Sequence, residues 1–168
     1  NSLDKAMSNT HAAGATVIVM NPRTGDILAM ANRPTFNPNQ FYRYGPEQWK
    51  NRAVTNIYEP GSTFKSIVAA AALQEGLVSP NEKFIDNGYV IVSGRRIQNW
   101  SGDAYGTITF TDIIKNSINT GFVQVGMRIG AARLTNYARS FGFGQLTNIE
   151  LPGEVEGLLF KPEDMRDS

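Results

Sequence analysis

A serine lies three residues before a lysine in Glu59-Pro60-Gly61-Ser62-Thr63-Phe64-Lys65. A serine hydroxyl is a poor nucleophile until a base takes its proton, and a lysine can be that base if its pKa falls. Side chains at positions i and i+3 lie on one face of a helix, where burial and the positive end of the helix dipole both lower a lysine pKa. Ser62 and Lys65 are therefore a candidate nucleophile and base, with the backbone N–H of Ser62 free to help bind an oxyanion. The alternative is that Ser62 only caps the helix and Lys65 is a solvated residue of its first turn.

A second candidate pair follows in Ser117-Ile118-Asn119. It lies in a break between two predicted helices, one from about Asp112 and one from about Thr120, where a hydroxyl and an amide can face one cleft. The alternative is that both residues cap the second helix. Each motif is weak alone, and the two in order carry more weight.

Two other matches lack a suitable context. Ser2-Leu3-Asp4-Lys5 also has the serine–lysine spacing, but it lies in a polar terminal stretch with nothing apolar to desolvate the lysine. Ser79-Pro80-Asn81 resembles the second motif but has the composition of a turn. We assign no chemistry to either.

The amino-acid composition restricts which other chemistry and which partners are possible. The chain has 168 residues, 41% of them hydrophobic, which suits one globular domain. The absence of cysteine excludes a thiol nucleophile, a disulfide and a thiolate metal site, and the single histidine, His11 in a polar stretch, is expected to be solvated. The base of a serine enzyme would then be a lysine or a carboxylate, and we expect neither a metal nor a cofactor. A net charge of +1 without a basic stripe argues against a nucleic-acid partner.

The pattern of residue types predicts a mixed α and β domain. A β-hairpin is expected from 15–20 and 27–31, then an irregular connection over 32–59 with at most a short helix at 46–49. The clearest helix covers 62–75 and ends at Gly76; it is apolar on every face in its middle and should be buried. The other expected elements are short strands within 83–92 and 95–100 around Ser93-Gly94, a strand at 107–110, a helix at 112–115 capped by Thr111, and helices at about 120–129 and 131–141 separated by Gly130.

No apolar run reaches the roughly 20 residues that a helix needs to cross a bilayer. The start of the chain also lacks the charged and apolar regions of a signal peptide. Any targeting or anchoring segment is expected to lie outside these residues.

Taken together, the segments resemble the transpeptidase domain of class B penicillin-binding proteins, of the division and sporulation type. The resemblance rests on Glu59-Pro60-Gly61-Ser62-Thr63-Phe64-Lys65 followed by Ser117-Ile118-Asn119. It extends over nearly the whole chain through Arg23 to Met30, Pro34 to Asn39, and Phe141-Gly142-Phe143-Gly144 leading to Leu151-Pro152-Gly153-Glu154. It implies an α+β fold (an α/β sandwich) like that of serine β-lactamases, with a central antiparallel sheet, helices on both sides and a helical subdomain.

The resemblance also implies roles for the four candidates. Ser62 would be the acylated nucleophile, Lys65 its base, Ser117 a proton relay toward the leaving amine, and Asn119 a ligand for the amide of the donor peptide. The substrate would be the D-Ala-D-Ala end of a peptidoglycan stem peptide, at the extracytoplasmic face of the bacterial membrane. β-Lactams would trap the same serine.

The chain departs from the family pattern in one respect. No Lys-Thr-Gly or close variant follows Asn119. Arg23-Thr24-Gly25 precedes the nucleophile and fits a hairpin turn, so we reject it as a substitute. Residues 1–168 are therefore expected to be the N-terminal portion of a transpeptidase domain, without the C-terminal strands. An unpaired sheet edge predicts pairing with the missing part, strand exchange or poor solubility. We do not expect efficient turnover by this chain alone.

Two further functions stay open. A D,D-carboxypeptidase or β-lactamase-like hydrolase would use the same motifs and transfer the acyl group to water. A non-catalytic module would capture β-lactam or cell-wall peptide, or bind proteins of the division machinery. Loss of binding on substitution of Ser62 by alanine would distinguish the covalent functions from the third.

Overall fold

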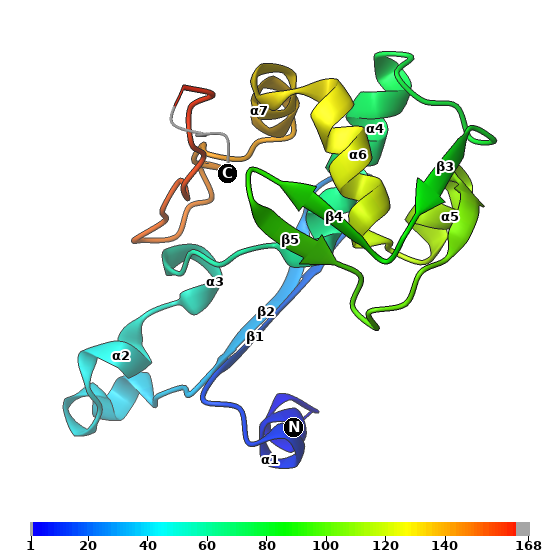
Figure 1. Cartoon of the computed structure of the whole chain (residues 1–168). Coiled ribbons are helices and arrows are strands. Elements are labelled where there is room, and N and C mark those ends of the chain that lie inside the picture. Colours follow the sequence, from blue (N-terminus) through cyan, green and yellow to red (C-terminus); the bar gives the residue numbers. More distant parts are fainter. Residues whose placement is uncertain (1, 164–168) are drawn as a thin grey trace. The chain divides into compact units, whose positions relative to one another are not determined.

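The computed structural model describes residues 2–163. The chain forms two compact units, Asn1–Ile57 with Leu146–Val155 and Tyr58–Gln145 with Glu156–Ser168. Within each unit, helices accompany short antiparallel strand pairs, so the α+β class predicted from the sequence is confirmed (Figure 1). Among the described residues no helix has the length and apolar character needed to cross a membrane.

The first unit is built on the predicted hairpin. Its elements are α1 (Ser2–Thr10), β1 (Ala15–Met20), β2 (Ile27–Arg33), the 3-10 helix η1 (Pro38–Arg43), α2 (Pro46–Trp49) and α3 (Arg52–Thr55). Strands β1 and β2 pair antiparallel from Ala15 opposite Arg33 to Met20 opposite Ile27, with a bulge at Val19 and Met20. The turn closes through a hydrogen bond of 2.9 Å from the N–H of Asn21 to the carbonyl of Asp26.

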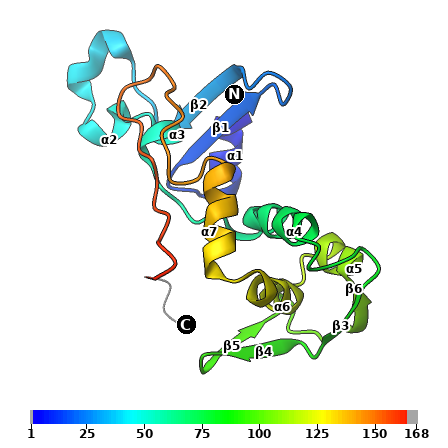
Figure 2. The ribbon, with the colours of Figure 1, turned by 90° about the horizontal axis from the view of Figure 1, so that it is seen from above.

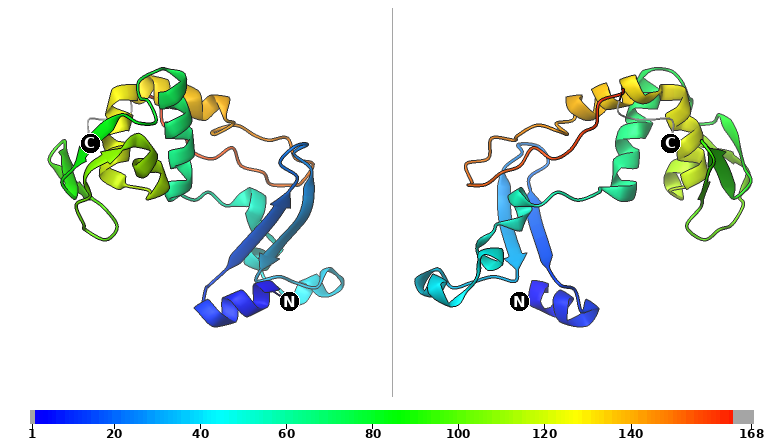
Figure 3. Two further views of the ribbon diagram at one scale, coloured as in Figure 1. Left: turned by 90° about the vertical axis from the view of Figure 1, so that its right-hand side faces the viewer. Right: turned by 60° about the vertical axis from the view of Figure 1, so that its left-hand side comes forward.

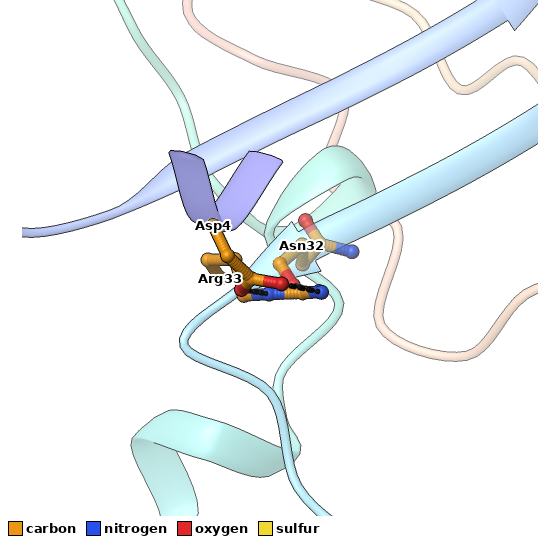
Figure 4. Close-up of polar contacts among 3 residues, drawn as sticks. All are labelled: Asp4, Asn32 and Arg33. Atoms are coloured by element: carbon orange, nitrogen blue, oxygen red, sulfur yellow. Dashed lines mark hydrogen bonds and ion pairs between the residues drawn. The ribbon is translucent and has the colours of Figure 1, made fainter. Parts of the chain in front are cut away.

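An arginine joins the end of this hairpin to the first helix. The guanidinium of Arg33 donates to both carboxylate oxygens of Asp4 and to the carbonyl of Asn32 (Figure 4). The contact to Asp4 lowers the pKa of that carboxyl. Asp4 and its neighbour Lys5 belong to the serine–lysine match to which no chemistry was assigned, and here Asp4 has a structural part.

The second unit contains both candidate motifs. Its elements are η2 (Gly61–Phe64, a 3-10 helix), α4 (Lys65–Gln74), β3 (Lys83–Asp86), β4 (Tyr89–Val92), β5 (Arg95–Gln98), β6 (Gly106–Thr109), α5 (Phe110–Lys115), α6 (Asn119–Ile129) and α7 (Ala131–Ser140). Helices α4, α6 and α7 pack on one another (Figure 2). Helix α6 lies between α4 and the hairpin of β4 and β5 (Figure 3).

Apolar side chains from α4, α5 and α6 form the core of the second unit. Its buried members are Val68, Ala69, Ala71, Ala72, Val78, Phe84, Ile108, Phe110, Ile113, Ile118, Phe122, Val125 and Ile129. Small alanines on α4 allow the neighbouring helices to approach closely, and Phe110, Ile113 and Val125 are fully buried. The starts of α4 and α6, where the motifs lie, are therefore positioned by packing on this core.

The strands of the second unit form two separate two-stranded sheets. β3 pairs antiparallel with β6, and β4 pairs antiparallel with β5 around Ser93 and Gly94. Both turn residues have positive φ, at 48° and 80°, which is the conformation of a tight type I′ turn. The expected central sheet takes the form of three two-stranded sheets in the described residues.

Several sequence-based boundaries are corrected. The helix predicted over 62–75 is a 3-10 turn over Gly61–Phe64 followed by α4, which buries one side and leaves Leu73 43% exposed. Helix α5 begins at Phe110, and its cap is Thr109 and not Thr111, because Asp112 and Thr109 form a reciprocal capping box. Helix α1 was not predicted, because it is rich in polar residues and none of its residues is buried.

Candidate active site

Lys65 is the centre of the site. It is the first residue of α4, and its Nζ donates hydrogen bonds to the Ser117 carbonyl at 2.7 Å, to Ser117 Oγ at 2.9 Å and to Asn119 Oδ1 at 2.6 Å. An ammonium has three donors, so these three acceptors satisfy it completely. The structure thus brings together three of the four residues predicted from the sequence, across more than fifty positions of the chain.

Ser62 stands in the 3-10 turn that leads into α4. The turn is possible because Gly61 has φ of +56°, a conformation that residues with a Cβ rarely adopt. The Ser62 side chain is exposed, and its hydroxyl and its N–H form no hydrogen bond with another described residue. Both groups of Ser62 are therefore available to a ligand.

The relation between Ser62 and Lys65 differs from that of an α-helical pair. The N–H of Lys65 donates to the carbonyls of Ser62 and Thr63, which gives the tight bonding of a 3-10 turn. The described residues include no hydrogen bond from Ser62 Oγ to Lys65 Nζ, because the lysine donors are directed to Ser117 and Asn119. In this arrangement all the hydrogen bonds of Lys65 Nζ go to the second motif.

Ser117 has an unusual backbone. Its φ is +53°, in the left-handed region that non-glycine residues rarely adopt. The turn is fixed on either side by hydrogen bonds from the N–H of Ser117 to the Ile114 carbonyl and from the N–H of Ile118 to the Ile113 carbonyl, while the Ile118 side chain is buried. This conformation points both the carbonyl and the hydroxyl of Ser117 at Lys65, and strain of this kind concentrates at functional sites.

Asn119 connects the lysine to the β4–β5 hairpin. It begins α6, and while its Oδ1 accepts from Lys65, its Nδ2 donates to the Gln98 carbonyl at 3.0 Å. Both ends of the amide are therefore held, which fixes its orientation. Asn119 has no side-chain capping bond to α6, although capping was the alternative reading of this residue.

Burial lowers the pKa of Lys65 below the ordinary value of a lysine. No carboxylate pairs with it among the described residues, so no opposite charge counteracts the effect. The ring of Phe122 has its centroid 5.2 Å from Nζ, and this cation–π contact favours the ammonium. A half-buried lysine without a counter-ion can lose its proton more readily than a solvated one, as a general base must.

Gln98 and Phe122 also contribute to the site, and neither was predicted from the sequence. Gln98 acts through its carbonyl, which any residue would supply, so its side chain carries no signal. Phe122 follows Asn119 by three positions on the same helix, and this spacing places both on one face of α6. That spacing could have indicated Phe122.

The donor set does not suit a metal. Among residues 2–163 no group of three or more His, Cys, Asp or Glu side chains is arranged to hold an ion. The groups that meet are instead a hydroxyl, an amide and an amine, and a second hydroxyl, that of Ser62, lies in the turn before Lys65, which suits acyl transfer through a serine.

Comparison with known proteins agrees with this chemistry. Residues 15–166 match the model of the penicillin binding protein transpeptidase domain. The chain is 42% identical over 163 residues to stage V sporulation protein D of Bacillus subtilis, covering 96% of this chain and 25% of that protein. It is 33% identical over 156 residues to peptidoglycan D,D-transpeptidase FtsI of Escherichia coli K12, covering 93% and 26%. The chain therefore spans about a quarter of the length of these relatives.

Solved structures show the same fold. The D,D-transpeptidase domain of a peptidoglycan glycosyltransferase from Eggerthella lenta superimposes with a TM-score of 0.82 at 31% identity, over 99% of this chain and 42% of that one. The transpeptidase domain of penicillin-binding protein 3 from Burkholderia pseudomallei gives 0.83 at 26% identity, over 98% and 45%. Sequence, fold and the joined motifs lead to one conclusion: the chain belongs to the penicillin-binding protein transpeptidase domain family.

Proposed function

We propose that this chain carries the acylation machinery of a peptidoglycan D,D-transpeptidase, with Ser62 as the nucleophile. The observation that supports this most directly is the convergence of Lys65, Ser117 and Asn119 beside the turn that holds Ser62. Its substrate would be a stem peptide ending in D-Ala-D-Ala, at the extracytoplasmic face of the cytoplasmic membrane. The relatives named D,D-transpeptidase support this substrate class.

The proposed reaction has two steps. Neutral Lys65 takes the proton of Ser62 Oγ as that oxygen attacks the carbonyl carbon between the two D-Ala residues. The C–N bond then breaks, the terminal D-Ala leaves as an amine that takes a proton through Ser117, and the acyl group stays on Ser62 as an ester. In the second step an acceptor amine attacks this ester, forms a new amide and returns the proton to Ser62.

The geometry suits these roles. Ser117 Oγ lies 2.9 Å from Lys65 Nζ and can exchange a proton with it, which a relay requires. Asn119 has an amide fixed at both ends, and a fixed dipole is better prepared to bind a peptide amide than a mobile one. The free N–H of Ser62 supports a part for it in binding the oxyanion.

The test is covalent labelling by a fluorescent penicillin, followed by a denaturing gel and intact mass measurement. The proposal expects one adduct on the chain that disappears in Ser62→Ala. Ser2→Ala is the matched control, because Ser2 also precedes a lysine by three residues, and it should label like the parent chain. Labelling that persists in Ser62→Ala would overturn the assignment of the nucleophile.

Transfer to an amine and transfer to water are distinguished by their products. A thioester or depsipeptide substrate offered together with a D-amino acid should give the amide as the main product if the chain is a transpeptidase. Free acid as the main product would favour the hydrolase. The expectation that residues 1–168 form the N-terminal portion of a longer transpeptidase domain, which pairs with further strands or division proteins, remains a prediction of the sequence.

A further inference from the structure

A buried carboxylate lies behind the candidate site. Asp86 is the last residue of β3 and is 1% exposed. Its Oδ1 accepts from the N–H of Gly88 at 2.9 Å, and its Oδ2 accepts from the N–H of Tyr105 at 2.8 Å. These two bonds fix the carboxylate within the loops that follow β3 and precede β6.

The other two bonds of Asp86 reach side chains from different elements. Oδ1 accepts from the hydroxyl of Thr120 at 2.6 Å, and Oδ2 accepts from Nδ2 of Asn99 at 2.9 Å. Asn99 in turn accepts at Oδ1 from the N–H of Thr120 at 3.2 Å. Asp86, Asn99 and Thr120 therefore form a closed ring of hydrogen bonds, and all three are buried.

Burying the carboxylate of Asp86 costs free energy that its surroundings must compensate. Among the described residues no cation pairs with Asp86, so hydrogen bonds alone compensate the buried charge. Burial raises the pKa of this carboxyl, but the bonds from Thr120, Tyr105, Gly88 and Asn99 outweigh it, and the net pKa lies below the ordinary value. A well-packed apolar group would often be at least as stable as a buried charge, which favours a role in specifying geometry.

The network lies directly against the Asn119 amide. Thr120 follows Asn119 at the start of α6, and Asn99 follows Gln98 at the end of β5. Asn119 and Gln98 are themselves joined by a bond of 3.0 Å. The carboxylate of Asp86 therefore binds Thr120, the residue after Asn119, and Asn99, the residue after Gln98.

We propose that Asp86 is a positioning residue, which holds the start of α6 against the end of β5 so that Asn119 presents its Oδ1 to Lys65. It acts through Thr120 and Asn99 and does not touch the reacting atoms. The inference rests on the proposed function for its effect on acylation, but the geometry of Lys65 and Asn119 can be tested without it.

The size of the effect follows from the geometry. A displacement of about 1 Å at a group that binds substrate can cost about 100-fold in rate. Losing the Thr120 bond frees α6 on one side of Asn119, so we expect a loss of this order in the rate constant for acylation by penicillin.

The most selective variant is Thr120→Val. Valine keeps the shape and branching of threonine but removes the hydroxyl that Asp86 accepts. Thr120→Ser keeps the hydroxyl and should restore acylation toward the parent value. The matched control is Thr109→Val, because Thr109 donates its hydroxyl to Asp112 at the same distance of 2.6 Å but lies at the start of α5. It should lower thermal stability and leave the acylation rate of the folded protein unchanged.

Asp86→Asn provides a second variant. An amide has one acceptor, so its NH2 would face either the donors Asn99 and Tyr105 or the donors Thr120 and Gly88. The variant keeps the volume but breaks half of the network, and it should reduce acylation at least as much as Thr120→Val.

A spectroscopic measurement separates this inference from the proposed function. The pKa of Lys65, followed by NMR of a labelled lysine side chain, should differ from the parent value in Thr120→Val and Asp86→Asn, because Asn119 no longer holds its acceptor at Lys65, and should stay at the parent value in Thr109→Val. If the parent is not acylated, the proposed function fails while this measurement still decides the inference. An unchanged Lys65 pKa in both variants would overturn it, as would losses of acylation no greater than those of Thr109→Val.

Discussion

The Nζ of Lys65 lies 2.6 Å from Oδ1 of Asn119, so the first residue of α4 is hydrogen-bonded to the first residue of α6. Both helices pack on a shared apolar core, which fixes their relative positions and so holds together two residues that are far apart in the chain. The contact also has a chemical effect. It gives the lysine a neutral acceptor in place of a carboxylate, so that burial can lower the lysine pKa.

The first prediction is a pH dependence of acylation. Since Lys65 must be neutral to accept the Ser62 proton, the rate constant for labelling by penicillin should rise with pH, with a midpoint below 10.5, the ordinary value. Stopped-time labelling across a pH series measures it. A rate that is independent of pH up to the ordinary lysine value would contradict a lysine base.

The lowered pKa of Lys65 also makes the stability of the fold depend on pH. The unfolded chain binds the Lys65 proton more tightly than the folded chain, so between the two pKa values the free energy of unfolding rises with pH. Lys65→Met should remove this contribution. Urea unfolding of both proteins at pH values below and near 10.5 tests the sign.

The second prediction concerns the charge of Lys65. Lys65→Arg keeps a cation with several donors but cannot lose its proton near neutral pH, so acylation should fall by about 10²–10⁴-fold while the fold remains. Lys5→Arg, in the other serine–lysine match, is the control and should have parental acylation. Normal labelling of Lys65→Arg at neutral pH would mean that another group is the base.

The third prediction concerns the strained backbone at Ser117. An alanine at φ of +53° keeps the strain, whereas a glycine removes it. Ser117→Gly should therefore be more stable than Ser117→Ala by about 1 kcal/mol, measured by denaturant unfolding. Both lose the hydroxyl beside Lys65, so both should lose acylation to a similar extent. Equal stability of the two variants would show that the left-handed conformation does not persist in solution.

The sequence was informative where a local signal determines the structure. The hairpin of β1 and β2, the turn at Ser93-Gly94 and the break at Gly130 were all indicated by turn residues between apolar runs, and each is present. The four candidate residues were found because two short motifs occurred in order.

Other features depend on contacts that no local pattern records. The start of α4 as a 3-10 turn depends on Gly61 and on the bonds of Lys65 to a loop far along the chain. The role of Asp86 was missed because the short strands predicted within 83–92 had no assigned boundary, although Asp86-Asn87-Gly88 has the composition of a turn. That signal could have marked the end of β3, but not the partner Thr120.

The fourth prediction uses two glycines of α6. A Cβ added to Gly121 would lie 2.6 Å from Cγ1 of Ile113, a fully buried side chain of α5, whereas a Cβ on Gly126 would meet nothing within 4 Å. Gly121→Ala should therefore destabilise the protein by about 1–3 kcal/mol through overpacking. Gly126→Ala should stabilise it by up to about 1 kcal/mol, because alanine favours the helix.

Denaturant unfolding of the two variants side by side measures the difference. In an Ile113→Ala background the same Gly121→Ala change should cost less, because the shorter side chain leaves room for the new methyl group. Since Gly121 lies two residues after Asn119, the displacement of α6 in Gly121→Ala should also slow acylation, whereas Gly126→Ala should not. Equal stability of Gly121→Ala and Gly126→Ala would contradict the close contact of α5 and α6 on which the position of Asn119 depends.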